Sequence, residues 1–445
     1  MPHTPPDAQR RYLLGAIAGA VIAFLALAGH HVVSARSGHC GADGPLTVLG
    51  GRDASGMRGL LIGRWRGLDG MRAEFRELPT STDLQHSEIV STARSGVCGA
   101  DVYVVDTPWI PELAKAGYID TVGVPERDLR QVIPSVLDTG RYQGKLWAVP
   151  LNTDAPLLIY RKDLVKNVPR DRGELMAEAA ALMRQPGTRL KSGLALQLSR
   201  YEGLTVNILE LIRDHGGDIT VSEDGKVRLD RRAVLATLRD LSAGLQGDRP
   251  LIRPESLDSD EDKDRVAFEN GDVAFMRNWP THYTLIANNG KLAPEQVGAV
   301  PYPGERVLGG QSLAVAAGLS GDRARAARDL IGYLNAPEQQ RRLFACGGLA
   351  PVRTDVYRTG SDECPDQVTS RKRLFLHADA QVIYQAVTGA RPRPSSVYYP
   401  EFSGELRVRI RERLKCMQTE CTQQPSAFLD ELTSALERAA HGRVR

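Results

Sequence analysis

A short polar segment, residues 151–154 (Leu-Asn-Thr-Asp), separates two apolar runs and carries an amide and a carboxylate. The flanking runs, residues 146–149 and 155–160, have the length and composition of buried strands. A polar group buried between strands needs a hydrogen-bond partner in the protein or in a ligand, because leaving it unpaired costs about 1 to 3 kcal/mol. Asn152 and Asp154 are therefore candidate ligand-binding residues, at a point where the chain would cross between two lobes along the floor of a cleft.

A second candidate, Asp106, follows the apolar run 100–105. A carboxylate at the end of a strand can accept hydrogen bonds from two hydroxyl groups at once, and such charge-assisted bonds are among the stronger ones. The same side chain could instead cap a helix that begins near Pro108. The two roles exclude each other only in part, so both stay open.

Strands and helices alternate around these residues, which indicates parallel strands joined by helices in an α/β lobe. Ligands of such sheets lie beyond the carboxyl ends of the strands. The first half of the pattern predicts strands at 46–50, 72–78 and 100–105 and helices at 57–66, 83–94 and 110–116. Later segments predict helices at 171–184, from 201 to 215, at 322–334 and at 339–345, a strand at 194–198, and a solvated loop or helix start in the acidic run 259–264.

Composition excludes several classes of function. The 445 residues, 42% of them hydrophobic, suffice for two or three core-forming units. The 57 basic and 54 acidic residues are spread along the chain, so no field of one sign is available to hold a nucleic acid. The glycine-rich loop 50–56 fails as a nucleotide motif, because Met57 and Arg58 stand where a phosphate-binding loop needs Lys and Ser or Thr.

The N-terminus predicts export. Arg10 and Arg11 precede an apolar stretch, residues 12–28, and Val33-Ser34-Ala35 has the form of a signal-peptidase site. An uncleaved membrane anchor is the alternative, since about 17 to 22 apolar residues begin to suffice for a tilted membrane helix. We therefore expect the protein on the extracytoplasmic face of the cell membrane, anchored or secreted.

The six cysteines of an exported chain predict disulfides rather than metal ligands or nucleophiles. Connectivity does not follow from the sequence alone. Their positions favour the pairs Cys416 with Cys421, Cys346 with Cys364 and Cys40 with Cys98.

The hinge region also carries a resemblance to a known family. The sequence Tyr142-Gln-Gly-Lys-Leu-Trp-Ala-Val-Pro150, with Asp154 and then Tyr160-Arg-Lys-Asp-Leu164, resembles the first hinge of the carbohydrate-type extracellular solute-binding proteins (family 1) that serve ABC importers. Residues 201–205 (Tyr-Glu-Gly-Leu-Thr) are similar to the trehalose/maltose-binding branch. The resemblance implies a two-lobe α/β fold of the type II periplasmic-binding-protein class, with lobes joined by three crossovers and preceded by an N-terminal apolar helix.

The resemblance begins near Leu46, continues to the end of the chain, and implies a domain division. Residues 1–44 would be a signal peptide or membrane anchor with a linker. The first lobe would contain residues 45–151 and 312–349, and the second residues 152–311 and 350–445.

The resemblance further implies site residues. In this family the loop 50–56 reaches into the cleft, so Arg52 or Asp53 would bond sugar hydroxyls. Trp279 ends a strand-like run and would stack on a sugar, since a flat aromatic ring covers the apolar face and leaves the hydroxyls to polar neighbours. An ordinary core position is the alternative for Trp279.

Two later segments resemble further parts of the family's cleft. Gly310 and Gln311 lie in the return crossover, and the family's cleft arginine would be Arg391 or Arg393, unless this Pro-Arg repeat is an exposed linker. Gln311 stands where the branch commonly has Trp, and Thr281 where it has an aromatic residue. Both departures favour a smaller or more polar ligand.

The implied function is capture of a sugar, as a di- or oligosaccharide, by a monomer that closes its lobes and passes the cargo to ABC permease subunits. No cofactor or metal is implied. A non-sugar solute and an extracytoplasmic sensor role are alternatives with the same fold. A glycoside hydrolase would need a paired acid and nucleophile, and no such pair, HExxH motif or Ser/His/Asp set has a recognisable setting here, so we expect no enzymatic activity.

Overall fold

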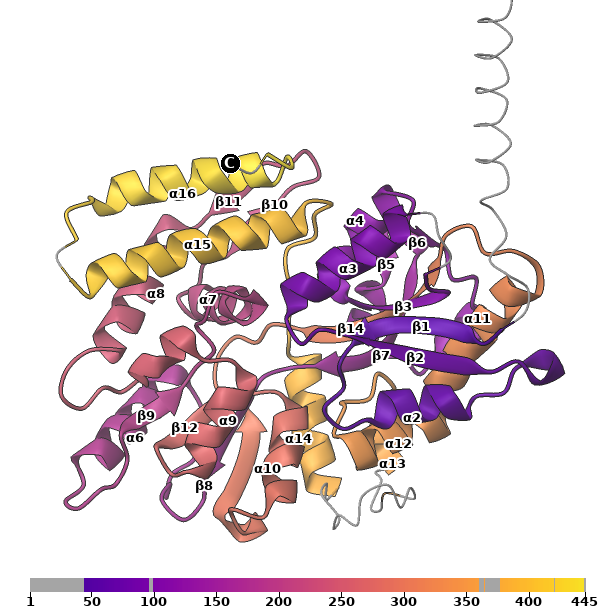
Figure 1. The fold of residues 1–445 in the computed structure, drawn as a ribbon. Helices are drawn as coiled ribbons and strands as arrows, with labels where there is room; N and C mark the ends of the chain where they lie inside the picture. Colours follow the sequence, from indigo (N-terminus) through magenta and orange to yellow (C-terminus); the bar gives the residue numbers. More distant parts are fainter. Residues whose placement is uncertain (1–43, 96–98, 360–363, 365–376, 420, 444–445) are drawn as a thin grey trace, which may run out of the picture.

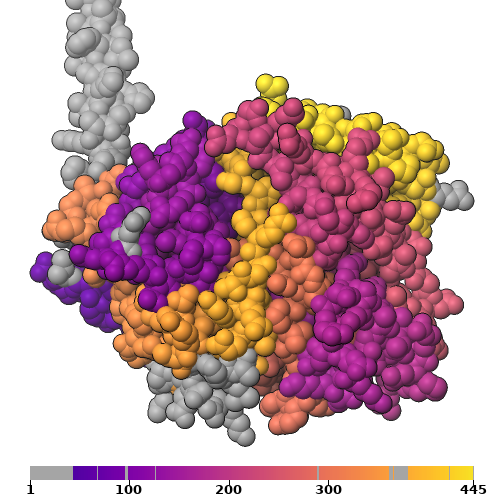
Figure 2. Space-filling view, turned by 180° about the vertical axis from the view of Figure 1, so that it is seen from behind, coloured from indigo at the N-terminus to yellow at the C-terminus, as the bar shows by residue number. Residues whose placement is uncertain are grey.

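The computed structural model describes residues 44–95, 99–359, 364, 377–419 and 421–443. Its longer strands form two separate sheets, each surrounded by helices, so the chain folds into two α/β lobes (Figure 1). Seen from behind, α14 (His377–Thr388) and the residues after it form an orange band between the halves (Figure 2).

The first sheet has the strand order β2-β1-β3-β14-β4, and β7 also pairs with β14. Strand β1 runs parallel to both β2 and β3, whereas β14 is antiparallel to each of its partners. The bounds are β1 (Leu46–Gly51), β2 (Ala73–Leu78), β3 (Val102–Asp106), β4 (Ile119–Asp120), β7 (Ala148–Asp154) and β14 (Gly309–Ala316).

Helices cover both faces of this sheet because alternate strand residues point to opposite sides. Val102 and Val104 of β3 join a core that includes residues of α2, α11 and α12, whereas Tyr103 and Val105 join a core that includes residues of α3 and α4. The bounds are α2 (Met57–Arg64), α3 (Thr82–Arg94), α4 (Ile110–Lys115), α5 (Pro134–Asp138), α11 (Gly321–Asn335), α12 (Pro337–Gly347) and α13 (Thr354–Thr359). The strands and helices predicted between residues 46 and 116 are confirmed, with small shifts at their ends.

The second sheet has the order β13-β8-β12-β9. Its strands are β8 (Leu157–Arg161), β9 (Ser192–Ala195), β12 (Val273–Asn278) and β13 (Val297–Pro301). The helices α6 (Arg172–Arg184) and α9 (Glu261–Glu269) contact the sheet, α14 contacts β13, and α10 (Pro280–Asn289) contacts α9. The helices α7 (Glu202–Asp214), α8 (Arg231–Gly244), α15 (Tyr399–Met417) and α16 (Pro425–Ala439) pack on one another beside it. Two small hairpins complete the fold, β5 (Arg141–Tyr142) with β6 (Lys145–Leu146) and β10 (Ile219–Val221) with β11 (Val227–Leu229).

The chain passes from the first sheet to the second between β7 and β8. The sequence predicts a strand over residues 146–149, whereas β7 continues through Pro150 to Asp154, and the passage falls at Ala155 and Pro156. The proline is accommodated because the pairing of β7 with β14 is irregular here, with a register shift next to Ser312. The return passage lies between β13 and β14.

The later predictions are confirmed for the helices, which are α6, α7, α11 and α12. The strand predicted at 194–198 is shifted to Ser192–Ala195. The acidic run 259–264 does start a helix, α9, with the Asp260 side chain accepting a hydrogen bond from the Lys263 backbone. It is not wholly solvated, however, because Asp264 is 0% exposed.

Two of the predicted disulfides are confirmed. Cys346 bonds to Cys364, and Cys416 bonds to Cys421. The third predicted pair, Cys40 with Cys98, lies outside the described residues, as does the predicted N-terminal apolar helix. Among the helices that the structure does describe, none has the length and apolar character needed to cross a membrane.

Candidate functional site

The ends of β3, β7 and β14 bring several of the predicted residues together. Gln311 of β14 lies opposite Asp106 of β3 on one side and opposite Asn152 of β7 on the other. Gly309 of β14 lies opposite Asp154. Two carboxylates and two amides therefore share one small area, where the chain passes between the lobes.

Gly310 permits this close approach of β14 and β7. Its φ is +123°, and a Cβ at this position would lie 2.4 Å from the backbone oxygen of Asn152. Any larger residue would push the two strands apart, because real Cβ atoms do not come so close to a backbone oxygen. The described contacts of Gly310 are thus with the neighbouring strand.

A residue that the sequence did not single out, Arg58 of α2, lies beneath this area. Its Nη2 donates to Asn152 Oδ1 at 3.2 Å and to Gln311 Oε1 at 3.0 Å, and its Nη1 donates to the carbonyl of Gly51 at 3.1 Å. The side chain is buried and its Nε has no hydrogen-bond partner. Burial lowers the pKa of Arg58, although the negative charges of Asp53 and Asp154 oppose this.

Asp154 is the second buried charge at this position. Its Oδ2 accepts a hydrogen bond from Asn152 Nδ2 at 3.2 Å, whereas its Oδ1 is buried and has no partner. The pKa of Asp154 is raised to about 7, mainly by burial, with the charge of Arg58 opposing the rise and that of Asp106 adding to it. The Asn152 amide thus links a guanidinium to a carboxyl group that titrates near neutral pH.

Asp53 is engaged at the beginning of α2. Its Oδ1 accepts hydrogen bonds from the backbone and the hydroxyl of Ser55, at 2.9 and 2.7 Å, and its Oδ2 accepts from the backbone of Arg58 at 2.8 Å. Both oxygens are therefore used to hold the turn before the helix. The neighbouring Arg52 is exposed.

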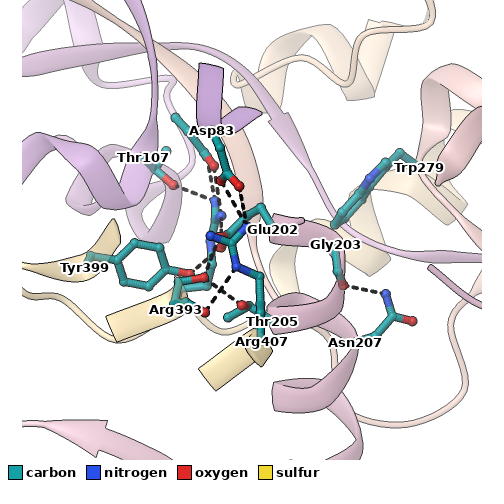
Figure 3. A network of polar contacts seen from close by, with 12 residues as sticks. Asp83, Thr107, Glu202, Gly203, Thr205, Asn207, Trp279, Arg393, Tyr399 and Arg407 are labelled. Carbon is teal, nitrogen blue, oxygen red and sulfur yellow. Dashed lines mark hydrogen bonds and ion pairs between the residues drawn. The ribbon is translucent and has the colours of Figure 1, made fainter. Parts of the chain in front are cut away.

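Asp106 and Arg393 form an ion pair that joins the two lobes. Figure 3 shows Arg393 among Thr107, Glu202 and Tyr399. Arg393 Nη1 and Nη2 donate to the two carboxylate oxygens of Asp106 at 2.9 and 2.6 Å, and Nη1 also donates to Glu202 Oε1 at 3.0 Å. Glu202 in turn accepts hydrogen bonds from the hydroxyls of Tyr399 and Ser403. The Asp106 side chain makes no helix-capping hydrogen bond, so of the two roles left open by the sequence, capping is not the one observed.

A second ion pair joins the lobes beside the first. Arg407 of α15 donates from Nη1 to both carboxylate oxygens of Asp83 in α3, at 2.9 and 3.1 Å. Asp83 lies in the first turn of α3 and Arg407 in the middle of α15, and Figure 3 shows the two side chains together. The described conformation is thus one in which the lobes touch.

Trp279 lies apart from these ion pairs (Figure 3), at the end of β12. Its Nε1 donates to Glu261 Oε1 at 3.1 Å, and the Arg277 guanidinium lies 3.9 Å from the centre of its ring. A Cβ on Gly309 would lie 3.7 Å from the ring, so Trp279 is close to the strand position opposite Asp154. The ring is half-buried rather than part of a closed core.

The two arginines proposed for the cleft have different surroundings. Arg393 is buried between the lobes, whereas the side chain of Arg391 is 53% exposed and pairs with Asp218 and Glu305 of the second lobe at 2.9 and 3.5 Å. The structure therefore brings Arg393 to Asp106 and leaves Arg391 on the surface.

Sequence reasoning missed Arg58, and the reason lies in helix geometry. Met57, Arg58, Leu61 and Ile62 form the buried stripe of α2. Such inward-facing stripes are normally apolar, so a charged residue within the stripe could have marked Arg58 as a functional candidate from the sequence. The sequence gives no sign of the role of Glu202, because its partners Arg393 and Tyr399 come almost two hundred positions later.

Comparison with known proteins agrees with this architecture. The model of the family "Bacterial extracellular solute-binding protein" matches residues 74–372, more than half of the chain. A "Probable ABC transporter-binding protein" of Deinococcus radiodurans is 26% identical over 350 residues, which are 75% of this chain and 79% of that protein.

Solved structures share the fold. The maltose-bound MalE3 of T. maritima has a TM-score of 0.74 and 24% identity, covering 90% of this chain and all of that one. The GacH receptor of Streptomyces glaucescens, solved alone and with acarbose, has a TM-score of 0.72 and 19% identity, covering 89% of this chain and 99% of that one. With the family match, these findings identify the chain as a member of the bacterial extracellular solute-binding protein family.

Proposed function

We propose that this protein captures a saccharide between its lobes, closes on it as a hinge, and delivers it to the permease of an ABC importer outside the cytoplasm. The observation that carries the proposal is the unpaired, buried Oδ1 of Asp154, which lies near a half-buried tryptophan ring where the lobes meet. A hydroxyl group can donate to this oxygen while the apolar face of a sugar lies on the Trp279 ring.

Similar proteins support the choice of ligand. The titles of the solved structures name maltose for MalE3 and acarbose for GacH, and that of an Agrobacterium radiobacter protein names ribitol. All three ligands are rich in hydroxyl groups. The similarity of the Deinococcus protein supports delivery to an ABC transporter.

We infer that the two lobes follow the predicted domain division. The first lobe would contain residues 45–151 and 312–349, and the second residues 152–311 and 350–445. Sheet membership supports this, except that β7 extends the first lobe to Asp154 and β14 begins it again at Gly309. The helix α13, within the predicted second lobe, packs against α12 of the first lobe as well as against α14. The passage at Ala155 and Pro156, the return before β14, and a third connection before α14 would together form the hinge, and the protein would act as a monomer.

Isothermal titration calorimetry with a panel of mono- and disaccharides tests the proposal. We expect binding without release of a product, and we expect Asp106→Asn and Trp279→Ala each to weaken it by about tenfold or more, or about 1.4 kcal/mol. Asp224→Asn, in the exposed turn between β10 and β11, is the control and should bind as the parent does. Equal affinity of all variants would show that the site is elsewhere, and absence of binding to every sugar would favour a non-sugar solute.

A further inference from the structure

Buried arginines in the described part of the chain usually have a carboxylate partner. Five of the seven pair with one at 3.0 Å or less, and Arg58 and Arg413 have no such partner among the described residues. Arg413 lies far from the hinge, against Phe428 and the Cys416–Cys421 disulfide. Arg58, which lies next to Asn152 and Gln311 where the chain passes between the lobes, is therefore a buried arginine whose charge is not matched by an ion pair.

The carboxylates nearest to Arg58 are already committed. Asp53 uses both oxygens for the turn before α2. Asp154 is separated from the guanidinium by the amide of Asn152, and no ion pair within 4 Å joins Asp154 to Arg58. The acceptors that Arg58 does have are neutral oxygens of Gly51, Asn152 and Gln311, which satisfy hydrogen bonds but leave the charge unmatched.

The Nε–Nη2 edge of the Arg58 guanidinium is the edge that other arginines of this protein use to bind carboxylates. Arg353 binds Asp355 through Nε and Nη2, at 3.0 and 2.8 Å, and Arg161 binds Asp163 through the same two atoms. In Arg58 the Nε is unpartnered, and Nη2 reaches the side chain of Gln311, which is only half-buried. A carboxylate that replaced the Gln311 amide could bind both atoms, and such a two-point, charge-assisted contact is stronger than a neutral one.

We propose that Arg58 selects an acidic saccharide, a sugar that carries a carboxylate as uronic acids do, and that this carboxylate displaces the Gln311 amide from Arg58. The inference rests on the proposed function, because it specifies the ligand of the same interlobe site. It assigns a specificity-determining role to Arg58 and explains why Gln311, rather than an aromatic residue, faces the guanidinium.

Asp154 need not repel a carboxylate that binds to Arg58. The charged groups that act on it are Arg58, Asp106, Arg277 and Glu261, which contribute two positive and two negative charges. Its own pKa of about 7, raised by burial, allows it to bind a proton near neutral pH. The carboxylate of an acidic sugar would raise the pKa of Asp154 further, so Asp154 would take up a proton when an acidic sugar binds. Binding of a neutral sugar would not cause this uptake.

Calorimetry with matched sugars tests the inference. Glucuronic and galacturonic acid, and disaccharides that contain them, are compared with the corresponding neutral sugars in buffers of different ionisation enthalpy. The parent protein should bind the acidic member of a pair at least tenfold more tightly and should take up a proton with it. Asp154→Asn should abolish the proton uptake and retain the preference.

Two variants and a control make the test specific. Arg58→Gln should lose the preference for acidic sugars. Gln311→Glu supplies Arg58 with a carboxylate from the protein itself, so it should weaken the binding of acidic sugars at least tenfold and that of neutral sugars less. Gln311→Glu keeps Arg58 buried and paired, so it tests the proposal even if Arg58→Gln does not fold. Arg413→Gln removes the other buried unpaired arginine and should retain the preference.

The outcomes separate the two proposals. If neutral sugars bind as tightly as acidic ones, or if Arg58→Gln keeps the parent ratio, the role of Arg58 is wrong while saccharide capture stands. If no sugar of either kind binds, the proposed function fails and the inference fails with it.

Discussion

At the scale of single residues, Asp264 shows what burial does to a carboxyl group. It is 0% exposed and accepts a hydrogen bond from Gln197 Nε2 at 2.7 Å, while the nearest guanidinium, that of Arg253, is 3.8 Å away. Burial raises its pKa from the ordinary 3.8 to about 8, and the hydrogen bonds only partly oppose this. The folded protein therefore holds a proton that the unfolded chain releases.

This difference predicts how stability depends on pH. Because the folded pKa is above the unfolded one, the contribution of Asp264 to the free energy of unfolding is fully present below about pH 4 and is lost as the pH rises towards 8. Asp264→Asn keeps the acceptor oxygen and cannot ionise, so it should raise the free energy of unfolding at pH 8 by roughly 3 kcal/mol and change it little at pH 4. Urea unfolding across this range is the measurement.

The exposed Asp224→Asn variant serves as the control, since that side chain should not produce the same fall in stability. A uniform shift of the Asp264→Asn curve at every pH would contradict the explanation, because it would point to packing instead of ionisation.

Residue types near strand ends could be predicted from the sequence, and their partners could not. Asp106, Asn152 and Asp154 lie in the last residues of β3 and β7, directly after the apolar runs that the sequence identifies, so their positions follow from the apolar pattern. The pairing of Asp106 with Arg393 spans 287 positions, and a local pattern carries no information on such a contact. The role of Arg58 likewise depends on which side of α2 faces the hinge.

At the scale of elements, the pairing of β7 with β14 determines the shape of the floor between the lobes. The sequence predicted the alternating strands and helices well because periodicity is a local property. It placed the end of the first hinge strand at residue 149, whereas β7 continues through Pro150 to Asp154. A proline at an irregular point in the ladder costs little, and the register that creates this point depends on a strand 160 positions away.

The close contact of these strands predicts a large effect of Gly310→Ala. The substitution combines an unfavourable φ of +123° with a Cβ placed 2.4 Å from a backbone oxygen, so we expect a loss of at least about 3 kcal/mol in the free energy of unfolding. Gly318→Ala is the matched control, since its φ is +83° but a Cβ there would meet nothing within 4 Å. It should cost only about 1 to 2 kcal/mol.

Denaturant unfolding of the two variants isolates the steric part of the effect. Equal losses would mean that β14 and β7 separate easily, and the tight floor of the site would then be wrong.

At the scale of the whole molecule, ion pairs between the lobes favour the closed form. Arg407 with Asp83 and Arg393 with Asp106 each join a residue of the first lobe to one of the second. The two-lobe fold could be predicted from the hinge sequence, but the closing contacts depend on where α15 lies against α3. Closure by ligands then adds to a bias already present in the protein.

Loss of one interlobe pair should shift this balance. Arg407→Gln removes the partner of Asp83, whose side chain is 53% exposed, so we expect a modest change of about 0.5 to 1 kcal/mol and a two- to fivefold weaker ligand affinity. Small-angle X-ray scattering should show a larger mean radius of gyration without ligand. Arg411→Gln, on the same helix but paired with Asp258 inside the second lobe, should leave both quantities unchanged.

The Cys346–Cys364 disulfide has a practical consequence for all of these measurements. It ties the end of α12 in the first lobe to the chain that leads into α14 of the second, and the two cysteines are 18 positions apart in the sequence. Protein produced in a reducing cytoplasm would lack this disulfide, so the connection between α12 and α14 would be longer and more flexible. Affinities determined on such material would describe a looser hinge, so recombinant samples need an oxidising route of production or a thiol titration before use.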